Sequence, residues 1–94
     1  MGDSGEPRNV LLVEGSHAEA ERIIQLLQQA AVAAGRLLWV ETMAQARRVT
    51  SENAFDAVLL DLDLPDSQGE ANIAACRDCC PDAAIIALTG PERA

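Results

Sequence analysis

The sequence has few of the residues on which nucleic-acid or membrane contacts depend. It contains no lysine and only two aromatic residues, Trp39 and Phe55, and none of its apolar runs reaches the about 18 residues of a membrane span. Two rings give single-stranded bases almost no surface to stack on. The formal net charge of −8 also repels phosphate backbones and anionic membranes. We therefore expect a cytoplasmic protein that binds neither nucleic acid nor membrane.

The thiols and the imidazole do not form an obvious metal-binding pattern. The three cysteines, Cys76, Cys79 and Cys80, lie in one short segment, and an odd count argues against a disulfide framework. A closed zinc site needs four ligands, and the only histidine, His17, is far away in the sequence. We expect the cysteines to be buried or half-buried helix residues. His17, in the first turn of a predicted helix, is expected to face solvent.

Apolar residues make up 49% of the chain and occur in short runs separated by helical patterns. Strands are predicted at 9–13, 36–41, 55–60 and 83–88. Helices are predicted from Ser16 to a stop at Gly35, at Met43–Glu52 and at 70–80. The first two helices each open with the spacing of a capping box. Strands that alternate with helices predict an α/β fold in which a parallel sheet has helices on both faces.

Polar residues follow three of the predicted strands. Glu14, Asp61 and Thr89 each stand at a strand end, and the carboxyl ends of parallel strands meet at one rim, where such folds bind their ligands. Two carboxylates and a hydroxyl there suit a hard cation and a phosphoryl group. An aspartate can itself be the nucleophile and form an aspartyl-phosphate.

The segments NVLLVEG, FDAVLLDLDLPDSQG and AAIIALTG resemble, in order and spacing, the receiver domain of two-component response regulators. In the second segment Asp61, Pro65 and Gly69 stand at the offsets typical of that family. The resemblance implies a flavodoxin-like, three-layer α/β/α fold with strand order 2-1-3-4 and three helices. Residues 1–8 would be a flexible leader, and residues 9–94 a partial receiver-like domain, since the family continues with another helix, strand and helix.

The resemblance also implies a role for each matched residue. Asp61 would accept a phosphoryl group from a histidine kinase or a phosphotransfer protein, and Thr89 would be the switch hydroxyl. Mg²⁺ would be held by Glu14, Asp61 and the backbone carbonyl of Asp63. Gly15 stands where the family has a second acid, so we expect Mg²⁺ to bind weakly. The module would signal by switching its contacts with a partner or within a dimer, and it would not be an enzyme.

Two further features bear on this prediction. The lysine that pairs with the phosphate in the family has no counterpart, because the sequence contains no lysine. Without a fifth strand, the fourth strand at 83–88 would have an open edge. Open edges favour pairing with another chain, so we expect a homo-oligomer formed through this strand, or dependence on a partner chain.

Other interpretations of the same acids remain open. Any one acid of the loop after residue 60 would ordinarily be solvated. A degenerate receiver that is not phosphorylated would act as a protein-interaction module. The D-x-D formed by Asp61 and Asp63 also resembles the first motif of haloacid-dehalogenase-like phosphatases, in which the first Asp is the nucleophile and the second a general acid/base.

Overall fold

The computed structural model describes residues 8–29 and 34–88, which form a parallel sheet and three helices. The strands of the sheet are β1 (Arg8–Val13), β2 (Ala34–Val40), β3 (Ala57–Asp61) and β6 (Ala84–Leu88). The helices are α1 (His17–Gln29), α2 (Met43–Glu52) and α3 (Glu70–Cys79). A small antiparallel hairpin, β4 (Asp63–Leu64) with β5 (Ser67–Gln68), lies between β3 and α3.

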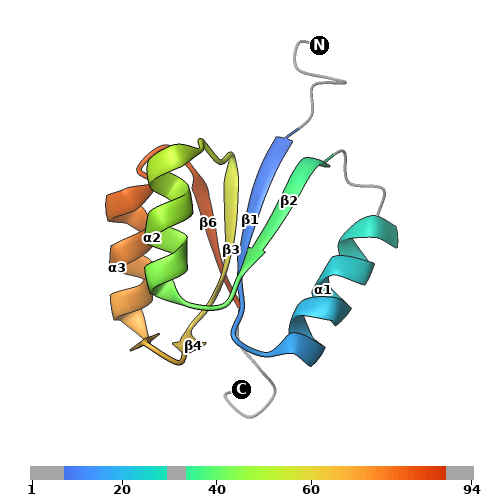
Figure 1. The fold of residues 1–94 in the computed structure, drawn as a ribbon, viewed down its shortest axis with the longest axis horizontal. Coiled ribbons are helices and arrows are strands. Elements are labelled where there is room, and N and C mark those ends of the chain that lie inside the picture. Colours follow the sequence, from blue (N-terminus) through green and yellow to red (C-terminus); the bar gives the residue numbers. More distant parts are fainter. Residues whose placement is uncertain (1–7, 30–33, 89–94) are drawn as a thin grey trace.

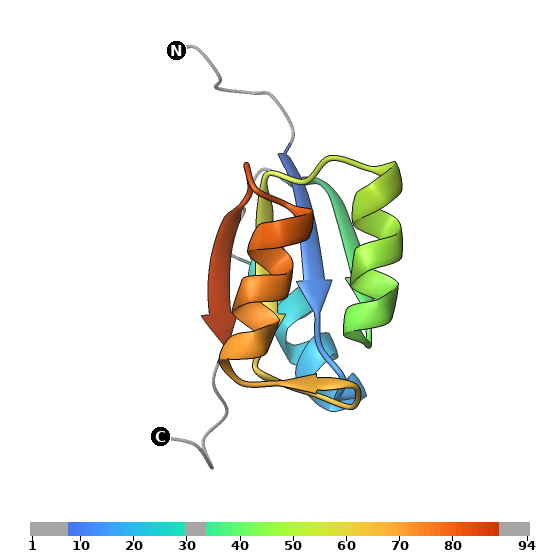
Figure 2. The ribbon, with the colours of Figure 1, turned by 90° about the vertical axis from the view of Figure 1, so that its left-hand side faces the viewer.

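The sheet has the order β2-β1-β3-β6, and all neighbouring strands are parallel. Because the hairpin lies outside the sheet, this is the predicted order 2-1-3-4. Helix α1 covers one face, while α2 and α3 lie side by side on the other (Figures 1 and 2). The predicted three-layer α/β/α fold is therefore confirmed. The strands end at one edge of the sheet, which brings the connection after β1 and the hairpin after β3 to the same rim (Figure 1).

The main apolar core lies between the sheet and the pair of helices α2 and α3. Successive side chains of a strand point to opposite faces of the sheet, so alternate residues of each strand enter this core. Its buried members are Leu11, Val13, Val40, Met43, Ala46, Val58, Leu60, Leu64, Ala75, Cys76 and Cys80. On the other face, Leu12 of β1 and Ala20 of α1 are fully buried. No helix in the described part of the chain has both the length and the apolar character needed to cross a membrane.

Most element boundaries lie close to those predicted, with one clear error. Helix α2 has its predicted bounds, and α3 ends one residue early. The predicted stop of the first helix at Gly35 is wrong, because β2 already begins at Ala34 and pairs there with Arg8. Except for Arg8, which begins β1, the predicted leader lies outside the described residues.

The N-terminus of α2 is capped twice, once from its own sequence and once from the loop that follows β3. Thr42 Oγ1 accepts a hydrogen bond from the Gln45 N–H at 3.1 Å, which is one half of the predicted capping box; the Gln45 Oε1 accepts from the Glu41 N–H at 2.7 Å instead of from Thr42. The Asp66 carboxylate accepts two more, from the N–H groups of Met43 and Ala44, both at 2.9 Å. The backbone donors at the start of a helix have no partners within it. Asp66 thus joins α2 to the hairpin loop.

Candidate functional site

The rim at the carboxyl ends of β1 and β3 brings together the side chains of Glu14 and Asp61. Glu14 directly follows β1, and Asp61 is the last residue of β3. The two strands are neighbours whose register pairs Val13 with Leu60. The two carboxyl groups lie close enough for the Asp61 carboxyl to raise the pKa of Glu14. Two of the residues predicted for the site from distant parts of the sequence are thus in contact.

Glu14 is nearly buried, with 5% of its surface exposed. Its Oε2 accepts a hydrogen bond from the Ser16 N–H at 3.1 Å, and its backbone carbonyl accepts one from Trp39 Nε1 at 2.8 Å. Burial, and then the hydrogen bond and charge of Asp61, raise the pKa of Glu14 to about 7, although the Ser16 N–H acts in the opposite direction. Glu14 therefore keeps a proton at pH values where an exposed glutamate is ionised.

The contact with Ser16 also changes the start of α1. The predicted capping box pairs Ser16 with Glu19, and the Glu19 N–H does donate to Ser16 Oγ at 3.3 Å. In a capping box the Ser16 N–H would donate to the Glu19 carboxylate, but here it donates to Glu14 Oε2. The Glu19 carboxylate forms an ion pair with Arg22 at 2.7 Å instead. The backbone at the start of α1 thus holds the Glu14 carboxyl at the rim.

Asp61 is half-buried and is held through both its side chain and its backbone. Its Oδ1 accepts a hydrogen bond from the Asp63 N–H at 3.0 Å. Its backbone carbonyl accepts one from Asn72 Nδ2 at 3.0 Å. Asn72 lies on α3 and is fully buried, and its own Oδ1 has no hydrogen-bond partner among the described residues. Asn72 was not predicted from the sequence as a residue of the site. Its position three and four residues before the buried Ala75 and Cys76 places it on the same buried face of the helix, and this spacing is visible in the sequence.

Gly69 shapes the chain between the rim and α3. Its φ of +70° lies in the left-handed region, where a residue with a side chain would be strained. Its N–H donates to the carbonyl of Leu62 at 2.7 Å, and its own carbonyl accepts from the N–H of Asn72 at 3.0 Å. This turn closes the hairpin loop and fixes the start of α3. It thereby also fixes the position of the Asn72 side chain.

Gly15 is packed closely against the loop that follows β3. A Cβ at Gly15 would lie 3.0 Å from Pro65 Cδ and 3.6 Å from the carbonyl oxygen of Glu41. An acidic side chain at this position would therefore require Pro65 to move by a few tenths of an ångström. Gly15 thus stands where the receiver pattern has its second acid, and it packs there against Pro65.

Of the other two predicted site residues, Asp63 belongs to the part of the chain that the structure describes and Thr89 does not. Asp63 begins the hairpin, where it pairs with Gln68, and its N–H is directed to Asp61. Thr89 lies outside the described residues. The residue before it, Leu88, is the register partner of Asp61 in the sheet, so β6 leads the chain to the same rim.

The oxygen atoms at the rim suit a hard divalent cation better than a soft one. Mg²⁺ prefers oxygen ligands, is held by one or two carboxylates and keeps several waters. Glu14 and Asp61 supply two neighbouring carboxyl groups that together would hold such a cation. Within residues 8–29 and 34–88, no group of three or more His, Cys, Asp or Glu side chains is arranged to hold a metal ion. The residues thus fit Mg²⁺ with water completing its shell.

The cysteines and the histidine lie as predicted. Cys76 and Cys80 are buried and Cys79 is half-buried, at the end of α3. Burial raises the pKa of the Cys76 thiol to about 11, so this thiol is unreactive at neutral pH. His17 is exposed; its Nε2 lies 3.0 Å from Glu41 Oε2, and its ring contacts the Trp39 ring edge-on at 4.9 Å.

Sequence comparison finds one informative relative, and no protein-family model matches the chain. The chain is 35% identical over 85 residues to the swarming motility regulation protein RssB of Serratia marcescens. The alignment covers 90% of this chain and 37% of RssB. The chain therefore spans little more than a third of the length of this relative.

Solved structures of receiver domains have the same fold. The response regulator MaeR bound to beryllium trifluoride has a TM-score of 0.79 at 23% identity, covering 88% of this chain and 67% of that one. A CheY-like receiver domain from Methylobacillus flagellatus has a TM-score of 0.73 at 24% identity, covering 94% and 74%. The receiver domain of a Pseudomonas aeruginosa sensor histidine kinase, with a magnesium ion coordinated in its active site cleft, has a TM-score of 0.73 at 27% identity, covering 90% and 69%.

Proposed function

We propose that this chain, which has the fold of response-regulator receiver domains and resembles them in sequence, accepts a phosphoryl group on Asp61. One observation carries the proposal: the half-buried Asp61 carboxyl at the end of β3 lies beside the nearly buried Glu14 carboxyl, which follows the neighbouring strand β1. Burial and the neighbouring Asp61 raise the pKa of Glu14 to about 7, so Glu14 places little negative charge beside Asp61 below this pH. The Asp61 carboxyl is thus the candidate nucleophile, at a rim that a phosphoryl donor can reach.

The transfer is a displacement at phosphorus. One carboxylate oxygen of Asp61 forms a bond to phosphorus, the bond from phosphorus to the donor breaks, and its electron pair leaves with the donor. The donor by family resemblance is a phosphohistidine of a histidine kinase or a phosphotransfer protein. When bound by Glu14, Asp61 and the Asp63 carbonyl, Mg²⁺ would neutralise charge on the phosphoryl group. The Asp63 N–H, which already donates to Asp61 Oδ1, orients the nucleophile.

The remaining parts of the proposal rest on the resemblance. Thr89 would be the switch hydroxyl that reports the phosphorylated state, and a cytoplasmic kinase would be the partner. A receiver accounts for Glu14 and Asp61 at the rim and for the turn at Gly69, whereas the phosphatase interpretation does not. The phosphatase interpretation uses Asp63 as an acid/base side chain, whereas Asp63 is held in a hairpin strand that contacts Asp61 through its backbone.

Incubation with acetyl phosphate and Mg²⁺, followed by intact mass spectrometry, tests the proposal. We expect one phosphoryl adduct on the unaltered chain and none on Asp61→Asn. Asp82→Asn is the matched control, since Asp82 is exposed and lies in the turn before β6, away from the rim. An adduct that persists in Asp61→Asn, or its absence from the unaltered chain, would overturn the proposal.

A second candidate function is supported by Gly15. The contact between Gly15 and Pro65 occupies the place of the second acid, and loss of one anionic ligand weakens Mg²⁺ binding. A receiver of this kind would act as a protein-interaction module without phosphoryl transfer. In that case the mass experiment gives no adduct, while the folded domain still binds its kinase partner.

We further propose that β6 is the contact between two copies of the chain. Among the described strands, β6 pairs only with β3. Ile86, on the face opposite the main core, has 48% of its surface exposed. An edge with unpaired backbone groups and an exposed apolar side chain is a template for pairing with a second strand.

A further inference from the structure

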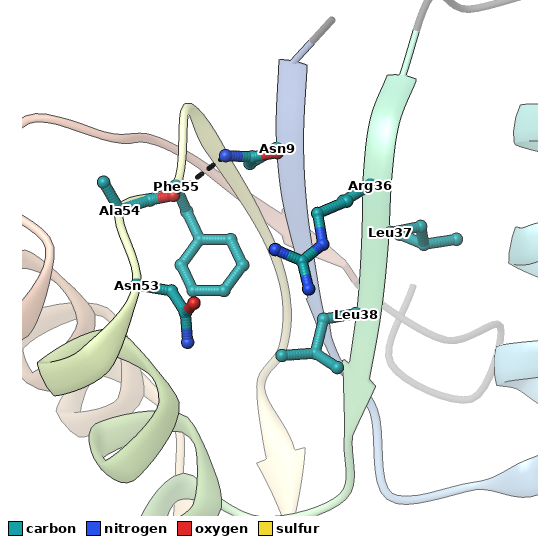
Figure 3. A pocket seen from close by; sticks show the side chains of 7 residues that line it. All are labelled: Asn9, Arg36, Leu37, Leu38, Asn53, Ala54 and Phe55. Carbon is teal, nitrogen blue, oxygen red and sulfur yellow. Dashed lines mark hydrogen bonds between the residues drawn. The ribbon is translucent and has the colours of Figure 1, made fainter.

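A cavity of about 410 Å³ lies at the opposite end of the sheet from Asp61. Asn9 and Arg36 line it from the first halves of β1 and β2, and 53–55, the residues between α2 and β3, close it from the other side (Figure 3). Its volume falls within the range of about 300–1,000 Å³ that is typical of small-molecule sites. The phosphoryl-acceptor role proposed for Asp61 makes no use of this cavity.

Hydrogen bonds fix one wall of the cavity. Asn9 Nδ2 donates to the carbonyl of Ala54 at 3.3 Å, shown as the dashed line in Figure 3. The Asn9 N–H donates to Asp56 Oδ2 at 2.8 Å, and the Asp56 N–H donates to the Asn9 carbonyl at 2.8 Å. Asn53 caps the end of α2 through Nδ2, which donates to the Val49 carbonyl at 3.1 Å. The wall formed by β1 and the 53–55 segment is therefore preformed.

The other side of the cavity carries a cation beside apolar surface. The side chains of Arg36 and Leu38 extend from β2 toward the ring of Phe55, whereas Leu37 points to the other face of the sheet (Figure 3). Within the described part of the chain, Arg36 has no ion pair and no acidic residue lines the cavity. Leu38 is one of the few large apolar side chains left exposed, at 38%. An unpaired guanidinium thus faces an aromatic ring in a chain of net charge −8.

This combination selects one chemical class of ligand. A guanidinium holds a carboxylate through two parallel hydrogen bonds, and a planar ring packs against Phe55 and Leu38. A phosphate ion would leave the apolar wall in water, and a neutral hydrocarbon would leave Arg36 without a counter-ion. We propose that the cavity bounded by Arg36, Leu38 and Phe55 binds a small aromatic carboxylate, with its carboxylate on Arg36 and its ring against Phe55.

Titration of the ¹⁵N-labelled chain with benzoate, followed by NMR, tests this proposal. We expect saturable shifts at Asn9, at 36–38 and at 53–55, with a dissociation constant of about 1 mM or tighter. Acetate has the charge without the ring, and benzyl alcohol has the ring without the charge. Acetate and benzyl alcohol are each expected to bind at least about tenfold more weakly than benzoate, because each makes only one of the two contacts.

Two variants identify the contacts. Arg36→Gln is expected to weaken benzoate binding at least about tenfold through loss of a charged hydrogen bond. Arg77→Gln, which removes an exposed arginine of α3 outside the cavity, should leave the affinity unchanged. No saturable shift up to about 10 mM benzoate, or equal binding by Arg36→Gln, would overturn the proposal. So would shifts of the same residues with protein concentration alone, which would show that a second copy fills the cavity.

Discussion

Glu14 shows most clearly how the fold changes the behaviour of a single side chain. Its carboxyl is nearly buried beside another carboxyl, and both conditions disfavour its charged form. The raised pKa makes the folded state bind a proton that the unfolded chain releases at lower pH. The position of Glu14 at the rim could be predicted from the sequence, but the burial of its side chain could not. That burial depends on the contacts of Glu14 with Trp39 and with the start of α1.

The pKa of Glu14 predicts how stability depends on pH. Because this pKa rises from 4.5 to about 7 on folding, the contribution of Glu14 to stability is fully present below pH 4.5 and is lost as the pH rises toward 7. Glu14→Gln removes this titration. The fall in unfolding free energy over this window, measured by urea denaturation, should be smaller in Glu14→Gln by about 1–3 kcal/mol, because each pKa unit corresponds to about 1.4 kcal/mol.

The Asp66 carboxylate titrates in a separate range and serves as an internal control. The backbone N–H groups of Met43 and Ala44 lower its pKa below the ordinary 3.8, so its contribution is lost only as the pH falls further. Asp66 is thus ionised throughout the window assigned to Glu14. An equal pH dependence in the unaltered chain and in Glu14→Gln would contradict the assignment.

Helix α2 depends on a residue that its own sequence does not include. Thr42 was predicted as a cap because it lies three residues before Gln45, whereas Asp66 is 23 residues from Met43 in the sequence. Capping patterns describe neighbours along the chain, so Asp66 could only be interpreted as one acid of a solvated loop. The tertiary cap follows from the position of the hairpin beside α2, which is a property of the fold.

Removal of this cap should destabilise the domain. Asp66→Ala leaves the N–H groups of Met43 and Ala44 without their side-chain acceptors, and we expect a loss of about 1 kcal/mol in unfolding free energy. Asp66→Asn keeps one carbonyl oxygen as an acceptor and should lose less. Asp82→Ala, at an exposed turn, should change the urea midpoint little. Equal midpoints for Asp66→Ala and Asp82→Ala would show that the cap contributes nothing.

At the scale of the whole molecule, the topology was predictable and the cavity was not. Alternation of strand and helix patterns leaves few arrangements for a parallel sheet, and the order 2-1-3-4 follows from the receiver resemblance. The cavity forms where Arg36 of one strand meets Phe55 of a loop. No local pattern links these two positions. The helical spacing of Asn72 from Ala75 and Cys76 indicates that it is buried, but it does not identify its partner, the backbone carbonyl of Asp61.

The edge of β6 gives a prediction for assembly. We expect the average mass in light scattering to rise with protein concentration. Ile86→Lys should keep the chain monomeric, because a charge on an edge strand opposes pairing. Leu26→Lys introduces the same charge at a side chain of α1 that is 55% exposed and should leave association unchanged. A monomer at every concentration, or equal association of both variants, would contradict the proposed contact.

Helix α2 also connects the two ends of the molecule. Its ten residues span about 15 Å, with the hydrogen bonds of Asp66 at one end and the Asn53 wall of the cavity at the other. If phosphorylation of Asp61 shifts the Asp66 loop and changes the affinity of the cavity by some factor, thermodynamic reciprocity requires the ligand to change the phosphorylation equilibrium by the same factor. A metabolite held at the far end of the sheet would then set how readily the chain stays phosphorylated, so one helix would make the domain respond to two inputs.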